Sequence, residues 1–232
     1  MYVTKMHLNL TLDLKVWFKM IRIKNLTKKF DKNISLDNIS IDFSKGEGIA
    51  LMGANGAGKT TLIRSILGYY HPTDGEVLVN GLNPVKERTK VLEEISFVPQ
   101  LPPPIKLSLK ELIYFVCKSS GVDKEKIYFY ADKMKLDINS NLNKSFFKLS
   151  GGMKQKLLIA ISLAKESKIV IYDEPTANLD PKARDDFYSL IKDKQNDKLS
   201  LFVTHRVEEV QEIVNREVYM DLGKVISDVS LS

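Results

Sequence analysis

Short apolar segments separated by polar or glycine-containing turns recur along most of the chain. Residues 20–26 alternate apolar and polar side chains, as a half-buried strand does, whereas residues 169–172 and 201–203 are apolar throughout, as buried parallel strands are. These patterns predict strands at residues 20–26, 40–43, 48–52, 75–80, 95–98, 169–172 and 201–203, and helices at residues 60–67 and 181–192. Alternation of strands with helices predicts an α/β domain with a mostly parallel core sheet.

Two other signals interrupt this alternation. Residues 75–80 lead into Asn80 and Gly81, and Asn-Gly is the pair favoured in tight hairpin turns, so we expect an antiparallel hairpin there. From Ser108 to about residue 167 the apolar positions follow helical spacing, and Ser108 with Glu111 forms a capping-box pattern. We therefore predict a helical subdomain over about residues 101–167.

Length and composition favour one domain of generous size. The chain has 232 residues, of which 44% are hydrophobic, so a well-buried core is expected without disulfide support. The single cysteine, Cys117, cannot form an intrachain disulfide. The longest apolar segments, such as residues 159–164, are far shorter than the roughly 20 residues that cross a bilayer. We therefore expect a cytoplasmic chain that does not span the membrane.

The N-terminus and the net charge add little to this prediction. Residues 1–19 precede the first strand and are interpreted as an N-terminal extension, with residues 20–232 forming the main domain; Lys5, Asp13 and Lys15 argue against a signal peptide. The net charge is +6, but the lysines are spread along the chain and not clustered among aromatic residues. We therefore do not expect nucleic acid as a partner.

One glycine-rich segment carries a specific chemistry. Residues 53–60, Gly-Ala-Asn-Gly-Ala-Gly-Lys-Thr, match the phosphate-loop pattern and lie between a predicted strand and a predicted helix. Glycines let successive backbone N–H groups converge on an anion, and the helix N-terminus adds its positive dipole end. Lys59 would reach the β- and γ-phosphates of a nucleotide, and Thr60 would bind Mg²⁺.

A second motif supplies acidic groups. The apolar segment 169–172 is followed by Asp173 and Glu174, at the strand end where open α/β sheets bind ligands. Asp173 would hold Mg²⁺ through water, and Glu174 would polarise the attacking water while the metal and Lys59 neutralise charge on the phosphoryl group. Alone, the pair could be a helix start; with the phosphate loop it predicts a nucleoside triphosphatase.

A third motif indicates which branch of these enzymes the chain resembles. Residues 149–155 read Leu-Ser-Gly-Gly-Met-Lys-Gln, and Ser150 alone could simply cap a helix. Together with the two other motifs, however, this segment resembles the signature of the ATP-binding cassette (ABC) ATPases, and the resemblance extends over about residues 21–226. It implies an ABC-type phosphate-loop fold: a mostly parallel core sheet, an antiparallel β subdomain and a helical subdomain.

The resemblance implies roles for four further sites. Phe30 corresponds to the aromatic residue that stacks on adenine, where tyrosine is more frequent, and Gln100 to the glutamine that touches Mg²⁺ and faces the membrane partner. Residues 177–180 resemble the loop that communicates across a dimer, although Ala177 and Asn178 replace its commoner residues. His205 resembles the histidine that contacts the γ-phosphate.

These observations give one set of expected site residues. The catalytic residues are expected to be Lys59, Glu174 and His205, and the metal-binding residues Thr60, Gln100 and Asp173. The nucleotide-binding residues are expected to be Phe30, Gly53, Ala54, Asn55, Gly56, Ala57, Gly58, Lys59, Thr60, Thr61 and Gln100, with Ser150, Gly151 and Gly152 contacting the ATP of a partner protomer.

The resemblance also implies partners and a location. One phosphate loop and one signature per chain imply pairing with a second cassette, most simply a homodimer, which drives a transmembrane permease on a separate chain at the inner face of the cell membrane. Its compact form is similar to ABC-2-type exporters and to ATPases that mature copper enzymes such as nitrous oxide reductase, so membrane-linked assembly is an alternative. A soluble, non-transport ABC ATPase is another; a single cassette without a long coiled coil argues against it.

Overall fold

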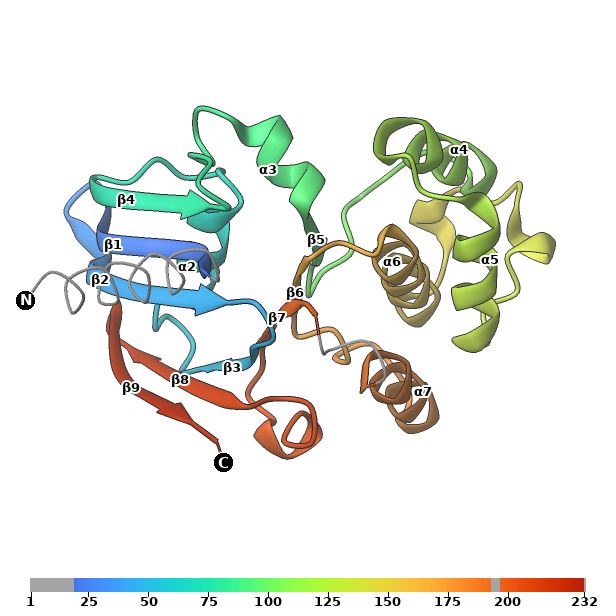
Figure 1. Ribbon diagram of the computed structural model, residues 1–232. Helices are drawn as coiled ribbons and strands as arrows, with labels where there is room; N and C mark the ends of the chain where they lie inside the picture. Colours follow the sequence, from blue (N-terminus) through green and yellow to red (C-terminus); the bar gives the residue numbers. More distant parts are fainter. Residues whose placement is uncertain (1–18, 193–196, 232) are drawn as a thin grey trace, which may run out of the picture.

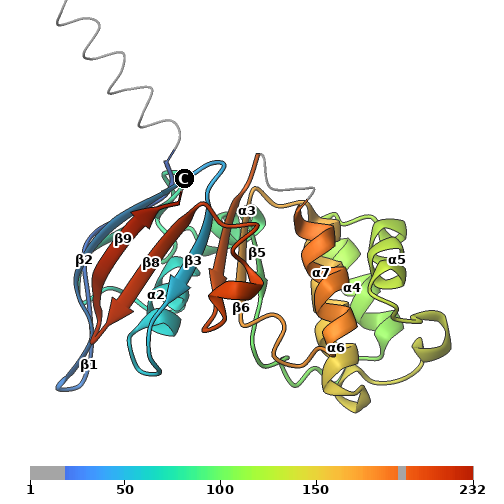
Figure 2. The ribbon, with the colours of Figure 1, turned by 90° about the horizontal axis from the view of Figure 1, so that it is seen from below.

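The structure is a computed structural model that describes residues 19–192 and 197–231. It has two sheets on one side of the molecule and a group of helices on the other (Figures 1 and 2). The strands are β1 (Lys19–Phe30), β2 (Asn33–Ser44), β3 (Gly48–Met52), β4 (Asp74–Val79), β5 (Ile95–Val98), β6 (Ile169–Asp173), β7 (Leu199–Val203), β8 (Arg216–Asp221) and β9 (Lys224–Ser230). The helices are α2 (Lys59–Ile66), α3 (Arg88–Glu94), α4 (Leu109–Ser120), α5 (Lys124–Lys133), α6 (Gly151–Lys165) and α7 (Pro181–Lys192), with 3₁₀ turns η1 (Asn139–Asn141), η2 (Phe146–Lys148) and η3 (Val207–Glu209).

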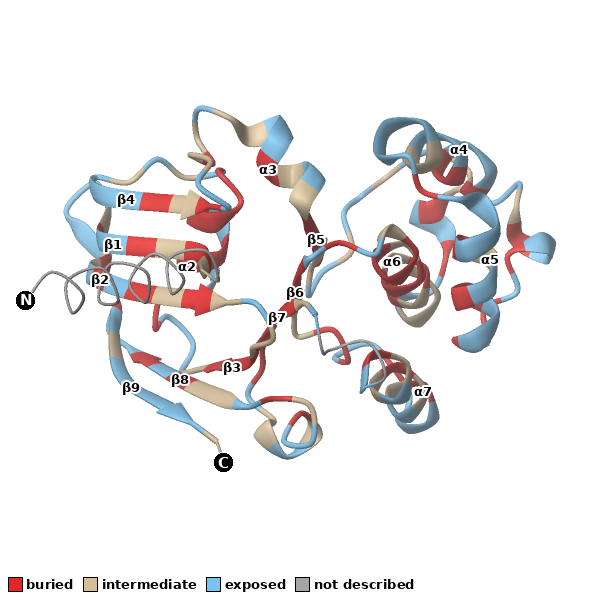
Figure 3. Cartoon of the chain, viewed as in Figure 1, coloured by how far each residue is buried: buried red, intermediate tan, exposed pale blue. Residues whose placement is uncertain are grey.

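The larger sheet forms the centre of the molecule. Its strand order is β5-β6-β7-β3-β8-β9; the first five strands are parallel, and β9 pairs antiparallel with β8 at the edge. Strands β6 and β7 are almost entirely buried, as Figure 3 shows, which explains why their sequences are apolar throughout. The predicted mostly parallel core sheet is confirmed.

The smaller sheet is antiparallel, with the order β2-β1-β4. Alternate residues of β1, including Ile21 and Ile23, are buried in one apolar cluster with Leu62, Ile63 and Ile66 of α2. This alternation produces the half-buried pattern seen in the sequence, because only one face of the sheet is covered. The antiparallel β subdomain is confirmed.

The tight turn predicted at Asn80 and Gly81 forms, but it closes a single antiparallel bridge and not a two-stranded hairpin. Both residues have positive φ (47° and 79°), and Val79 forms a β-bridge with Leu82. No strand of the described chain continues from this turn, however, and β4 pairs instead with β1. The Asn-Gly dipeptide determines the turn. Burial of the apolar face of β4 against α2, however, favours pairing of β4 with β1, which is distant in the sequence.

The helical subdomain is confirmed. Helices α4, α5 and α6 share a second apolar core with Phe146 and Leu149 (Figure 1). The predicted capping box starts α4: the Ser108 hydroxyl accepts a hydrogen bond from the Glu111 amide (3.3 Å), and the Glu111 carboxylate accepts one from the Ser108 amide (2.8 Å). Gly121, with φ 65°, ends the helix.

Several elements and boundaries were not predicted. Helix α3, strands β8 and β9, and the first half of β2 have mixed or exposed side chains and therefore lack a clear apolar period. The boundaries at residues 19/20 and about 101–167 stay predictions, and residues 1–18 lie outside the described residues. Within the described ranges, no helix combines the length and apolar character needed to cross a membrane.

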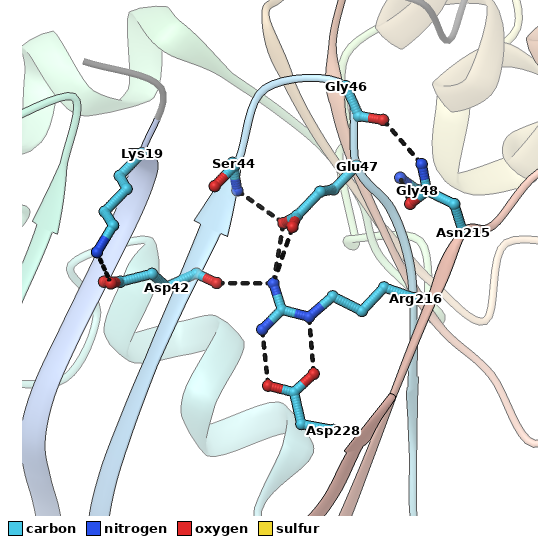
Figure 4. A network of polar contacts seen from close by, with 9 residues as sticks. All are labelled: Lys19, Asp42, Ser44, Gly46, Glu47, Gly48, Asn215, Arg216 and Asp228. Atoms are coloured by element: carbon cyan, nitrogen blue, oxygen red, sulfur yellow. Dashed lines mark hydrogen bonds and ion pairs between the residues drawn. The ribbon is translucent and has the colours of Figure 1, made fainter. Parts of the chain in front are cut away.

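A network around Arg216 joins the two sheets far from the ends of the parallel strands where the site lies (Figure 4). Its guanidinium, only 14% exposed, donates to both carboxylate oxygens of Glu47 (3.0 Å each) and to the Asp42 carbonyl (2.9 Å). It also forms a two-pronged contact with Asp228 of β9, at 2.7 Å for each bond. One side chain thus connects β8, β9, β2 and the turn before β3.

We expect Arg216→Ala to lower the free energy of unfolding by about 2 kcal/mol, because Glu47 and Asp228 lose their shared partner. Urea denaturation followed by circular dichroism measures the change. Arg22→Ala is the control, since Arg22 is more exposed and lies 3.9 Å from Asp42, and should cost less than about 0.5 kcal/mol. Equal effects of both changes would contradict the assignment of Arg216 as the central residue of the network.

Candidate functional site

The phosphate loop, residues 53–60, leaves the C-terminal end of β3 and enters α2. Gly53 has φ 139°, and a Cβ atom added to it would lie 2.1 Å from the Met220 carbonyl oxygen at the end of β8. Gly58, with φ 102°, precedes α2, and a Cβ there would lie 2.7 Å from the Ser35 carbonyl oxygen. Both positions therefore require glycine, for conformation and for space.

Lys59 is the first residue of α2, and its side chain turns back over the loop. Its ammonium donates to the carbonyl oxygens of Gly53 (2.6 Å) and Ala54 (3.0 Å). A cation fixed at the N-terminus of a helix, beside a glycine-rich turn, provides a site for an anion of high charge density.

The two carboxylates lie where the sequence placed them. Asp173 is the last residue of β6, and Glu174 follows with φ 44°, a left-handed conformation that is strained for glutamate. One Glu174 oxygen accepts a hydrogen bond from the Gln100 amide nitrogen (3.2 Å), and the other lies 3.1 Å from His205 Nδ1. A carboxylate only accepts, so Nδ1 carries the hydrogen of this contact. Glu174 is thus held from both sides.

A single pocket brings most of the expected groups together. It is lined by Asn55, Gly56, Ala57, Gly58, Lys59, Thr60, Thr61, Gln100, Asp173 and Glu174, and also by Ser35 and Val203. His205 does not line this pocket, but its Nδ1 contacts Glu174, which does. Sequence reasoning missed Ser35, whose hydroxyl lies 2.8 Å from that of Thr61; nothing near Ser35 in the chain marks it.

The surroundings of Asp173 raise the pKa of its carboxyl above the ordinary value. Burial is the largest cause that raises the pKa of Asp173, and the neighbouring Glu174 raises it further, whereas Lys59 and Arg64 oppose the rise. Ionisation of Asp173 therefore lowers the stability of the folded chain while no cation is bound. Such a carboxylate is suited to receive positive charge.

Phe30 lies outside this pocket, at the end of β1. Phe30 is 40% exposed, and its ring and that of Tyr70 form a T-shaped pair with ring centres 5.0 Å apart. The ammonium of Lys28 lies 4.9 Å from the Phe30 ring and donates to the His71 carbonyl (2.9 Å). Sequence reasoning missed Tyr70, since a contact between β1 and the segment after α2 leaves no local signal.

Ser150, Gly151 and Gly152 do not line the pocket of their own chain. Ser150 caps α6, its hydroxyl accepting a hydrogen bond from the Met153 amide (3.2 Å). The glycines lie against Asn178, whose carbonyl oxygen would be 3.1 Å from a Cβ on Gly152. The Asn178 side chain in turn donates to the Gln100 carbonyl (3.3 Å), so this surface is connected to the pocket.

A phosphate loop at the end of a parallel strand, with a lysine and two carboxylates beside it, defines a phosphate-loop nucleotide-binding protein. Comparison with known proteins assigns the family. The family model described as ABC transporter matches residues 36–177. The chain belongs to the ABC transporter family as its ATP-binding component, in which ATP hydrolysis drives transport.

Relatives of known name agree with this assignment. The chain is 33% identical over 225 residues to the energy-coupling factor transporter ATP-binding protein EcfA2 of Clostridium perfringens, covering 90% of this chain and 79% of the relative. It is 31% identical over 229 residues to the phosphonates import ATP-binding protein PhnC of Wolinella succinogenes, covering 90% and 82%.

Solved structures agree on the fold. An ATP-binding subunit of an ABC transporter has a TM-score of 0.83 at 24% identity, over 91% of this chain and 90% of the other. MJ0796, a bacterial ABC transporter cassette whose structure is dimeric, has a TM-score of 0.78 at 26% identity, over 92% and 99% of the two chains. The ABC-type architecture is therefore shared along nearly the whole chain.

The raised pKa of Asp173 predicts a more stable variant. Because folding raises the pKa of Asp173, its contribution to stability is present at low pH and is lost as pH rises from the ordinary aspartate pKa through the raised folded value. We expect Asp173→Asn to raise the Tm of the nucleotide-free protein by a few degrees at neutral pH. Thermal melts from about pH 4 to pH 8 test this; a Tm gap that does not widen with pH would contradict it.

The exposed ring of Phe30 predicts a base-dependent loss of affinity. We expect Phe30→Ala to weaken ATP binding by roughly tenfold or more, whereas Phe30→Trp retains it, because a stacked base depends on an aromatic face. Isothermal titration with ATP measures this. Inorganic triphosphate, which has no base, should bind both variants like the parent chain, and an equal loss for both ligands would argue against stacking at Phe30.

Proposed function

We propose that this chain is a Mg²⁺-dependent ATPase that hydrolyses ATP between two cassettes and passes the resulting motion to a transmembrane permease. The observation that carries this proposal is the convergence of Glu174, Gln100 and His205 beside Lys59 and the phosphate loop. Hydrolysis needs a group that positions water, cations that neutralise the phosphoryl oxygens, and an enclosed site for the phosphates. The pocket offers a residue for each requirement.

The pocket also suits magnesium. In the described part of the chain, no three His, Cys, Asp or Glu residues cluster as a metal site, so a cation would depend on the nucleotide for several ligands. Mg²⁺ is bound in this way, by one or two carboxylates together with phosphates and waters. We infer that Thr60 supplies a hydroxyl oxygen, Gln100 an amide oxygen and Asp173 a carboxylate acting through water. Bound there, the ion would neutralise charge on the β- and γ-phosphates.

Each catalytic residue has a distinct role in the proposed mechanism. The Glu174 carboxylate accepts a hydrogen bond from the attacking water and orients it toward the γ-phosphorus. The contacts with Gln100 and His205 hold that carboxylate in its strained position. Lys59 exchanges its loop carbonyl partners for phosphate oxygens. The exposed His205 ring donates through Nδ1 to Glu174 and, with a hydrogen on Nε2 as well, would donate through Nε2 to a γ-phosphate oxygen.

We infer that Ser150, Gly151 and Gly152 contact the ATP held by a second copy of this chain. Their position outside their own pocket supports this, because one chain then has two half-sites and no complete one. The MJ0796 cassette, at 26% identity, is dimeric in its structure. Two copies arranged head to tail would bury each ATP between a phosphate loop and a partner's signature segment, and residues 177–180 would lie at that interface.

We infer that the permease is a separate chain and that the cassette lies at the inner face of the cell membrane. The relative EcfA2 is an ATP-binding protein of the energy-coupling factor transporter, which supports a membrane-bound partner. Gln100 lies at the start of the segment that joins β5 to the helical subdomain, and Leu101 beside it is 77% exposed. This segment is placed to pass motion between the pocket and a partner.

Glu174→Gln tests the proposed function. The neutral amide of glutamine is a much weaker base than the carboxylate and polarises the attacking water poorly. We therefore expect ATPase activity to fall by roughly 100-fold or more while ATP still binds. Phosphate release measures the rate, and size-exclusion chromatography in ATP and Mg²⁺ measures association. The parent chain should hydrolyse slowly, and the variant should accumulate as an ATP-dependent dimer.

The opposite results are equally informative. Hydrolysis that is unchanged in Glu174→Gln would reject the role of Glu174. Absence of an ATP-dependent dimer in both forms would reject the shared site. Omission of Mg²⁺ is a separate control, and activity that persists with a chelator present would reject the metal assignment.

A further inference from the structure

Glu209, the last residue of η3, has an unusually complete set of partners for a residue outside the pocket. One carboxylate oxygen accepts from the Thr176 hydroxyl and the Tyr188 hydroxyl, each at 3.0 Å. The other accepts from the guanidinium groups of Arg206 (2.9 Å) and Arg184 (3.3 Å). The Glu209 side chain is only 17% exposed, so these four bonds satisfy a largely buried charge.

The four partners come from three segments, two of which also carry residues of the site. Thr176 follows Glu174 by two residues, in the loop after β6. Arg206 follows His205 directly, in the segment after β7. Tyr188 and Arg184 are on α7, and Arg184 also donates through Nε to the Leu179 carbonyl (3.1 Å), within residues 177–180.

The hydrogen bonds and positive charges around Glu209 stabilise its ionised carboxylate. Burial acts to raise the pKa of Glu209, but hydrogen bonds from Arg206, Thr176 and Tyr188 and the charge of Arg184 outweigh it and lower the pKa. Glu209 is therefore ionised at neutral pH. Its charge fixes two arginines that would otherwise sample many rotamers.

The catalytic pair needs such support. Glu174 has a strained backbone although its side chain is only 20% exposed, and the His205 side chain is 62% exposed, so burial does not position His205. Their mutual contact of 3.1 Å depends on how the segment after β6 and the segment after β7 lie relative to each other. Beyond the strand pairing of β6 with β7, Glu209 joins these two segments through side chains.

We propose that Glu209 is a positioning residue for ATP hydrolysis, which holds Glu174 and His205 in register by bonding Thr176 and Arg206 at once. This inference rests on the proposed roles of Glu174 and His205. It differs from a purely stabilising role, because displacement of a catalytic carboxylate by about 1 Å slows the chemical step without weakening ATP binding.

Glu209→Gln is the primary variant, since it keeps the size of the side chain and removes its charge. Glu209→Asp is the second variant, since it keeps the charge and retracts the carboxylate. The matched control is Glu47→Gln, which also removes a carboxylate from a half-buried contact with arginine but lies before β3, at the opposite end of the parallel strands from the site. Each variant is assayed for kcat, KM, ATP affinity and Tm in the full chain.

We expect Glu209→Gln to lower kcat by roughly tenfold or more, with KM and ATP affinity within about threefold of the parent values. Glu209→Asp should have an intermediate kcat. Glu47→Gln should lower Tm to a similar extent while its kcat stays within about twofold of the parent value, because it alters only the distant network.

A parent-like kcat in Glu209→Gln, with a Tm loss like that of Glu47→Gln, would overturn the inference and leave Glu209 as a stabilising residue only. If Glu209→Gln fails to fold, Glu209→Asp decides: reduced kcat at parent KM supports the inference, and parent kcat overturns it. Glu174→Gln is run in parallel. Full activity in that variant rejects the proposed function, whereas an inactive Glu174→Gln beside an unaffected Glu209→Gln rejects this inference alone.

Discussion

Four neighbouring parallel strands end at one edge of the core sheet, and every other part of the site depends on this constraint. In the order β5-β6-β7-β3, their C-terminal ends carry Gln100, Asp173 with Glu174, His205 and the phosphate loop, respectively. Because the strands are parallel and hydrogen-bonded, groups from four distant segments lie side by side. Apolar burial of β6 and β7 on both faces fixes the register, so the same interactions that stabilise the core position the chemistry.

The site also departs from what stability alone would favour. Asp173 is a carboxylate in a partly buried position, and Glu174 has a left-handed backbone without being glycine. Both features cost free energy in the absence of a ligand, and the surrounding sheet maintains them. The Arg216 network, by contrast, satisfies its charges fully at the other end of the sheet (Figure 4). The charges at the Arg216 end of the sheet are thus paired and stabilise the fold, whereas the groups at the other end are strained and form the candidate site.

How far the sequence predicts this molecule depends on whether a feature is local. The phosphate loop and the Asp173–Glu174 pair are contiguous in the chain, so their residue types and spacing sufficed, and the apolar runs of β6 and β7 predicted the parallel sheet. Ser35, Tyr70 and Glu209 could not be predicted, because their contacts with Thr61, Phe30 and Thr176, respectively, join segments that are distant in the sequence. Strands β8 and β9 were not predicted, because many of their side chains are exposed and their sequences show no clear alternation of apolar and polar residues.

Asn178 contacts both the pocket and the segment that contains Gly152. Its side chain bonds the Gln100 carbonyl of its own pocket, while its backbone lies directly beneath Gly152 of the surface proposed to meet the partner's nucleotide. A displacement of Asn178 would therefore move both the pocket and that surface. In the proposed head-to-tail pair, the two hydrolysis events would then influence each other.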